Sequence, residues 1–148
     1  VQRVLTQEQV PADSLELEIT EETVMQDASM AGEILSDLDR LGVRLAVDDF
    51  GTGYSSMAYL KRFPLDALKI DRAFIHGLPE DGSNAAIVEA SIYLGQKLGL
   101  EVVAEGVESP AQWEFLRTHR CDQIQGFLLS HPVPLPDLIE FLDSRSAH

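Results

Sequence analysis

Strand-like and helical patterns alternate along this chain, and this alternation limits its possible folds more than any other feature. Apolar residues recur with period two, as in strands, at residues 15–19, 44–48, 67–71, 101–104 and 122–126. Helical spacing, or a helix start or stop signal, marks residues 1–9, 31–41, 55–60, 85–98, 109–116 and 135–142. Strands and helices that alternate in this way predict right-handed βαβ units and a parallel sheet.

Two architectures contain such a sheet: an open doubly wound sheet and a (β/α)8 barrel. The central strands of a doubly wound sheet are covered by helices on both faces and read as nearly continuous apolar runs. Here each strand has one apolar and one polar face, as Leu17 and Ile19 show beside Glu16 and Glu18. A polar interior inside a ring of helices favours a TIM-like barrel, of which about five parallel strands are recognisable.

Composition narrows the class of protein. The chain has 148 residues, 45% of them hydrophobic, which suits one globular domain with a substantial core. Its 25 acidic and 11 basic residues give a net charge of −14, and such a surface repels the phosphates of nucleic acid. A phosphate-bearing substrate would therefore need a metal ion between itself and these acids.

The sequence also bears on location. No stretch approaches the roughly 20 apolar residues that cross a membrane, so we expect no membrane contact from this segment and a cytoplasmic protein. The one cysteine, Cys121, cannot form an internal disulfide and suits a reduced compartment. We expect it to be a small core residue.

Polar side chains lie at the end of every predicted strand, where barrels carry their chemistry. They are Glu18, Asp48 with Asp49, Lys69 with Asp71, Glu105 with Glu108 just beyond, and Gln125. Converging carboxylates repel each other unless cations neutralise them, and oxygen ligands favour Mg²⁺ or Mn²⁺ over zinc. Asp48 or Asp49 could bridge two ions about 4 Å apart, the spacing that activates water in phosphodiester hydrolysis. Lys69 would then orient or polarise that water, or offset phosphate charge.

Five segments together resemble, in order and spacing, the EAL-domain cyclic di-GMP phosphodiesterases. The segments are LELEITEE at residues 15–22, LAVDDFGTGYSS at 45–56, ALKIDRAFI at 67–75, VVAEGVES at 102–109 and DQIQGFLLSHPVP at 122–134. The resemblance implies a (β/α)8-type barrel with one antiparallel strand. It also implies hydrolysis of cyclic di-GMP to linear pGpG with two Mg²⁺ or Mn²⁺ ions.

The resemblance also implies roles for individual residues. Glu18 and Asp48 resemble ligands of the first metal, and Asp48 with Asp49 and Glu105 resembles the environment of the second. Lys69 resembles the lysine that contacts the catalytic water. The remaining implied roles are substrate binding by Asp71, Glu108 and Gln125, and anchoring of the regulatory loop by Glu21 through the hydroxyl of Ser55 or Ser56. Because that loop couples metal binding to a dimer interface in the family, a homodimer is expected.

Two family features are absent from this sequence: the Glu-Ala-Leu motif, which supplies a metal-binding glutamate, and the asparagine of a later N-L-S segment. His131 also stands where the family often has a basic residue. A whole barrel has about 250 residues, so we expect residues 1–148 to be the C-terminal part of one EAL domain. Its open edges would belong to a longer chain, with upstream sensory or GGDEF domains possible, or would be covered by a second copy. The 148 residues alone are expected to be inactive or nearly so.

Two other functions remain open at this point. One is a non-catalytic cyclic di-GMP receptor or a dimerisation and signalling module, although such receptors commonly lose acids that persist here. The other is an unrelated metal-binding α/β domain with phosphoacceptor chemistry, which paired aspartates and a strand-end lysine also fit. The segments EGVE and QGF count against the second.

Overall fold

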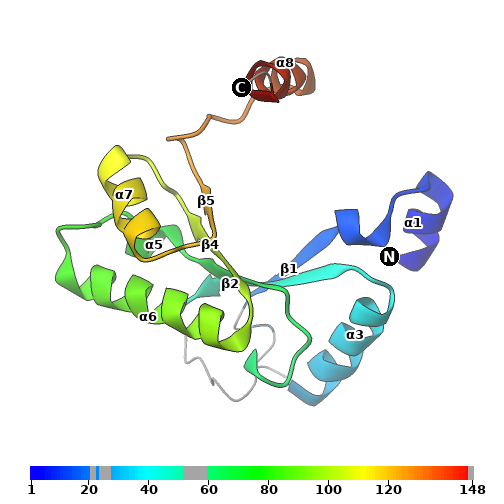
Figure 1. Cartoon of the computed structure of the whole chain (residues 1–148). Coiled ribbons are helices and arrows are strands. Elements are labelled where there is room, and N and C mark those ends of the chain that lie inside the picture. The colour runs from blue at the N-terminus through cyan, green and yellow to red at the C-terminus, as the bar shows by residue number, and fades with distance from the viewer. Residues whose placement is uncertain (21–22, 24–27, 52–59, 147–148) are drawn as a thin grey trace.

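A computed structural model describes residues 1–20, 23, 28–51 and 60–146, and in this part five strands form one parallel sheet (Figure 1). The strands are β1 (Glu16–Thr20), β2 (Arg44–Phe50), β3 (Ala67–Ile70), β4 (Glu101–Glu105) and β5 (Gln123–Gln125). They lie side by side in sequence order, and each pairing is parallel. An open doubly wound sheet reverses its strand order at a switch point. The uninterrupted order therefore agrees with the barrel expectation.

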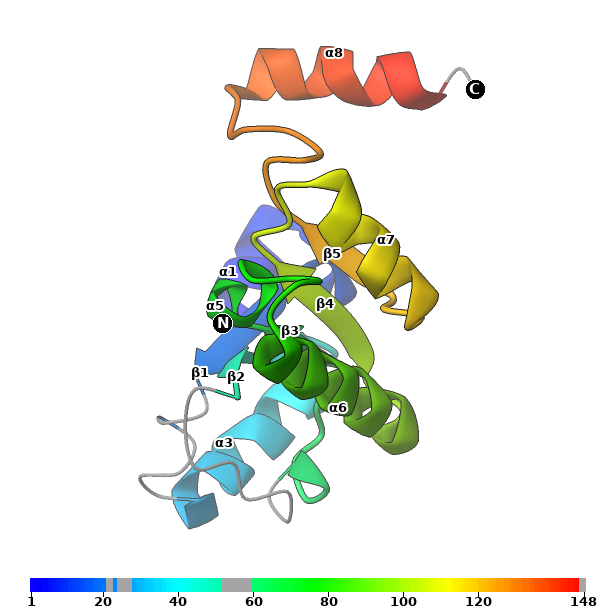
Figure 2. The ribbon, with the colours of Figure 1, turned by 90° about the vertical axis from the view of Figure 1, so that its left-hand side faces the viewer.

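Several helices pack on one side of the sheet, whereas the first helix precedes β1 and the last lies away from the sheet. The helices are α1 (Gln2–Glu8), α3 (Ala28–Arg40), α5 (Arg72–Ile75), α6 (Gly82–Leu98), α7 (Pro110–Thr118) and α8 (Leu135–Ser146), with a 3-10 turn, η1 (Ala12–Ser14), before β1. Helix α3 contacts β2, and α6 contacts both β3 and β4. Helix α8 lies away from the sheet in both views of the ribbon, joined to β5 by residues 126–134, which include a turn (Figures 1 and 2).

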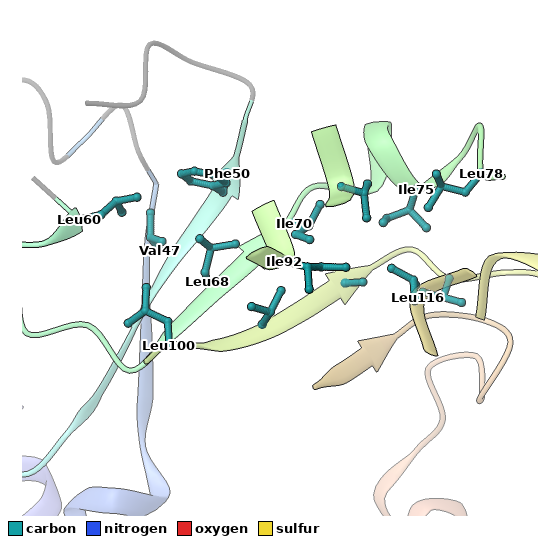
Figure 3. Packing of buried hydrophobic residues seen from close by; sticks show 14 residues of the cluster. Val47, Phe50, Leu60, Leu68, Ile70, Ile75, Leu78, Ile92, Leu100 and Leu116 are labelled. Carbon is teal, nitrogen blue, oxygen red and sulfur yellow. The ribbon is translucent and has the colours of Figure 1, made fainter. Parts of the chain in front are cut away.

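The hydrophobic core lies between the sheet and these helices. Alternate residues of the central strands supply one side of it, including Leu68 and Ile70 of β3. Ile92 of α6 and Leu116 of α7 supply the other side, and Figure 3 shows Ile92 beside Leu68 and Ile70. Because strand side chains alternate between faces, the residues between the core positions must point to the opposite, inner face.

Helix boundaries follow from capping groups. The Asp81 carboxylate accepts hydrogen bonds from the backbone N–H groups of Ser83 and Asn84, at 2.9 and 3.1 Å, so α6 begins at Gly82. The sequence pattern had placed this start three residues later, because apolar spacing begins only there. The helix predicted from residue 109 is confirmed, because Ser109 and Gln112 form a capping box at the start of α7.

The structure shifts the bounds of each predicted strand by one or two residues, as β2 and β3 illustrate. Strand β2 runs on to Phe50, so Asp49 lies inside it instead of after it, and Asp48 is no longer its last residue. Strand β3 stops at Ile70, because the Asp71 carboxylate accepts a 2.7 Å hydrogen bond from the backbone N–H of Ala73 and caps α5. Sequence periodicity missed α5, which has only four residues.

Two further expectations can be compared only with the residues that the structure describes. Of the helix predicted at residues 55–60, only Leu60 lies among the described residues, where it joins the core. Within the described ranges, every helix is too short or too polar to cross a lipid bilayer.

The central strand generates a prediction about stability. Leu68 has 0% of its surface exposed, and truncating such a residue costs about 2–5 kcal/mol through lost burial and a cavity. We expect Leu68→Ala to lower the free energy of unfolding by that amount in urea denaturation. Ile34→Ala on α3, where the side chain is 53% exposed, is the control. Equal losses in the two variants would contradict the assigned core.

The thiol of Cys121 generates a second prediction. It packs partly buried against the core and donates weak hydrogen bonds to the carbonyls of Val102 and Gln123, at 3.4 and 3.3 Å. Burial raises the pKa of this thiol to about 11. Since only the thiolate reacts, we expect alkylation at pH 8 to be roughly 100-fold slower in the folded protein than in urea. Equal rates would show that the thiol is not desolvated.

Candidate active site

Polar side chains form two layers on the inner face of the sheet, as the alternation of the strands predicted. In the layer at the amino ends, the Arg44 guanidinium donates to Glu16 Oε2 at 3.1 Å and to Glu101 Oε2 at 2.6 Å. Gln123 Nε2 donates to Glu101 Oε1 at 2.5 Å. Arg44 reaches β4 across β3, whose inner-face residue at that level is the small Ala67.

Lys69 occupies the centre of the layer at the carboxyl ends. Its ammonium nitrogen lies 2.5 Å from Glu18 Oε1 and 2.5 Å from Glu105 Oε1. The residue is only 5% exposed. Burial by itself would lower the pKa of Lys69, but its hydrogen bonds with Glu105 and Glu18 outweigh that effect and raise the pKa. Lys69 is therefore a charged cation held between two predicted site acids.

Asp48 and Asp49 lie where β2 departs from regular geometry. The register with β3 shifts between Val47 and Phe50, and Asp49 has a positive φ of 54°. The backbone N–H of Asp49 donates to the Asp48 carboxylate at 2.9 Å. This bulge lets two consecutive acids serve the same end of the sheet, although a regular strand would point them to opposite faces.

The acids at this end influence one another. Burial raises the pKa of Asp49, and a hydrogen bond with the Asp71 carboxyl and the charges of Asp48 and Glu105 raise it further. Four of the predicted site residues are thus close enough to interact. A cluster of this kind favours a bound cation, because a cation relieves the repulsion among its carboxylates.

Of the three predicted substrate-binding residues, Asp71 belongs to this cluster, and Gln125 and Glu108 lie on neighbouring segments. Gln125 is exposed on β5, in register with Glu105 of β4. Glu108 lines a cavity of about 390 Å³. Its other lining residues are Arg72, Ala73, His76, Gly106 and Gln112.

Sequence reasoning missed Arg72, His76 and Gln112 as parts of this cavity. One signal for Arg72 was available, since it directly follows the strand-end Asp71. Gly106 has a φ of +71°, and a Cβ there would lie 2.5 Å from Arg72 Cβ. Glycine therefore allows the two segments to approach closely.

The oxygen donors at the strand ends suit hard divalent cations, but their arrangement is not that of a ready-made metal site. Among the residues described, no group of three or more His, Cys, Asp or Glu side chains is placed to hold an ion. The ammonium of Lys69 lies between Glu18 and Glu105 instead. The ligand roles of these acids stay predictions, and Glu21, Ser55 and Ser56 lie outside the described residues.

Comparison with known proteins identifies the family of this fold and site. The family model described as the EAL domain matches residues 1–132, and the chain therefore belongs to the EAL domain family. The sheet and its helices are the corresponding portion of the TIM-type fold of solved EAL domains.

Particular relatives are similar over most of this chain. The cyclic di-GMP phosphodiesterase NbdA of Pseudomonas aeruginosa is 51% identical over 142 residues, which is 96% of this chain and 18% of NbdA. The bifunctional diguanylate cyclase/cyclic di-GMP phosphodiesterase MucR of the same species is 49% identical over 94% of this chain and 20% of its own. The chain thus spans about a fifth of the curated relatives' length.

Solved structures agree with this assignment. The MucR phosphodiesterase in complex with cyclic di-GMP superposes with a TM-score of 0.90 and 49% identity, over 93% of this chain and 56% of that one. BlrP1 of Klebsiella pneumoniae, solved with manganese and cyclic di-GMP, superposes with a TM-score of 0.81 and 35% identity. That match covers 88% of this chain and 33% of BlrP1.

The buried amide of Gln112 generates a prediction for the cavity. Its Oε1 accepts from the backbone N–H groups of Glu108 and Ser109 at 2.7 and 2.9 Å, and its Nε2 donates to the Ile75 carbonyl at 3.1 Å. We expect Gln112→Leu to cost about 1–3 kcal/mol in unfolding free energy, because buried backbone groups lose their partners. The exposed Gln96, which makes one such bond to Arg120 at 3.1 Å, gives the control Gln96→Leu. A loss no larger than the control's would contradict this role.

Proposed function

We propose that the protein containing this chain hydrolyses cyclic di-GMP to linear pGpG with the help of divalent cations. The observation that carries the proposal is the convergence of Glu18, Asp48, Asp49, Lys69 and Glu105 at the carboxyl ends of four neighbouring strands. A phosphodiesterase solved with cyclic di-GMP has the same fold over 93% of this chain. Fold and acids together support hydrolysis of this phosphodiester.

The proposal includes two Mg²⁺ or Mn²⁺ ions held by Glu18, Asp48, Asp49 and Glu105. Bound ions would supply a water molecule of lowered pKa and offset the charge of the substrate phosphate. The BlrP1 complex with manganese supports a divalent ion in this family. Asp71, Glu108 and Gln125 are proposed to line the substrate site, with Glu108 placed at the cavity beside α5.

A non-catalytic cyclic di-GMP receptor, or a dimerisation and signalling module, is the competing function. A receptor needs the substrate surface but has no need of a charged lysine between acids. The proposal also extends to a homodimer in the cytoplasm, with upstream sensory or GGDEF domains. The name of MucR, which joins a cyclase activity to a phosphodiesterase activity, supports a multidomain parent.

Asp48→Asn in the full-length protein tests the proposed hydrolysis. The change removes one charge from the predicted metal ligands, so we expect pGpG formation in Mg²⁺ or Mn²⁺ to fall by about 100-fold or more. Product can be separated from cyclic di-GMP by chromatography. Asp39→Asn, which removes the same charge from the exposed surface of α3, should leave the rate unchanged.

The wild-type protein distinguishes the two functions. If it binds cyclic di-GMP but forms no pGpG with either ion, the receptor function replaces hydrolysis. A rate in Asp48→Asn equal to that of the wild type would contradict the assigned role of this carboxylate.

A further inference from the structure

Lys69 contacts two carboxylates that the proposed function would give to metal ions. Its ammonium is 2.5 Å from one carboxylate oxygen of Glu18 and 2.5 Å from one of Glu105. Both glutamates are proposed metal ligands. The two acids come from β1 and β4, on either side of β2 and β3, and Lys69 joins them from β3.

Lys69 is more deeply buried than the two glutamates that it contacts. The side chain is 6% exposed, whereas those of Glu18 and Glu105 are 47% and 20% exposed. A buried ammonium is stable only while its charge is balanced, and these two carboxylates provide that balance. A carboxylate engaged by Lys69 must rearrange or share its oxygens before it can ligate an ion. A bound metal ion and the Lys69 ammonium would therefore use the same carboxylate oxygens of Glu18 and Glu105.

We propose that Lys69 is an internal counter-ion that competes with the divalent cation for Glu18 and Glu105, and thereby sets the metal affinity of the site. The proposal rests on the proposed function, because it takes these acids as metal ligands.

The competition has a reciprocal consequence. If the lysine weakens metal binding, bound metal must weaken the lysine contact by the same factor. Without a bound ion, Lys69 offsets part of the negative charge of these acids, and the site fills only when the ion concentration is high enough to displace the ammonium. Lys69 is thus a positioning residue for the ligands, whatever further contact it makes with water or substrate.

Metal titration of the full-length protein tests this proposal directly. Binding of Mn²⁺ or Mg²⁺, without cyclic di-GMP, can be followed by calorimetry in the wild type and in Lys69→Met. We expect the variant to bind the ion roughly 5–150-fold more tightly, the usual range for two coupled equilibria. Lys69→Arg keeps a cation at this position and should retain weak binding. Lys97→Met removes a lysine that lies 5.2 Å from the ring centroid of Tyr93 on the exposed side of α6, and should match the wild type.

A second measurement needs no substitution at the site. In ¹⁵N-labelled wild-type protein, the ammonium resonance of Lys69 should change as diamagnetic Mg²⁺ is added, whereas that of Lys97 should not. This readout keeps the proposal testable if Lys69→Met fails to fold. A purely structural role for Lys69 predicts equal or weaker metal binding in Lys69→Met and an unchanged ammonium resonance.

The outcomes separate this proposal from the proposed function. The competition is contradicted if a folded Lys69→Met binds the metal ion no more tightly than the wild type does. It is also contradicted if the Lys69 ammonium resonance stays unchanged while Mg²⁺ binds. Neither result contradicts the proposed hydrolysis. If neither ion binds the wild type or any variant, the competition and metal-assisted hydrolysis both fail. Tighter binding in Lys69→Met but not in Lys97→Met supports the competition.

Discussion

Two cations balance the charge on the inner face of the sheet, and the arrangement of the other polar groups depends on them. Arg44 joins Glu16 of β1 to Glu101 of β4 near the amino ends of the strands. Lys69 makes the same connection near the carboxyl ends, between Glu18 and Glu105. In both layers the acids come from β1 and β4, and the cation comes from a strand between them.

The two layers differ in how complete that balance is. Arg44 meets two acids, and Gln123 satisfies a further oxygen of Glu101, so the amino-end layer is hydrogen-bonded from β1 to β5. At the carboxyl end, one lysine faces Glu18, Glu105 and the pair at the bulge of β2. An excess of acid over base at one end of a sheet costs stability, and such excess is typical of sites that bind cations. The carboxyl-end layer, with its excess of acid, is therefore the one that we propose to bind cations.

Much of this arrangement was predictable from sequence, because it depends on local periodicity. Alternation placed Glu16, Glu18 and Lys69 on the polar face, and parallel pairing brought their strand ends to one edge. The pairing of Lys69 with Glu18 was not predictable, since the two residues are 51 positions apart and their contact depends on how strands stack. The positive φ of Asp49 likewise depends on the local bulge, and the buried amide of Gln112 was visible only as half of a capping box.

The paired acids of β1 and β4 also bear on the curvature of the sheet. Neighbouring strands are about 4.8 Å apart, so Arg44 and Lys69 each reach an acid two strand spacings away. If the sheet flattened, the side chains of its outer strands would splay apart and these contacts would lengthen. If it curled further, like charges would crowd together. The two bridges therefore resist bending in either direction and fix the radius at which the strand ends face one another.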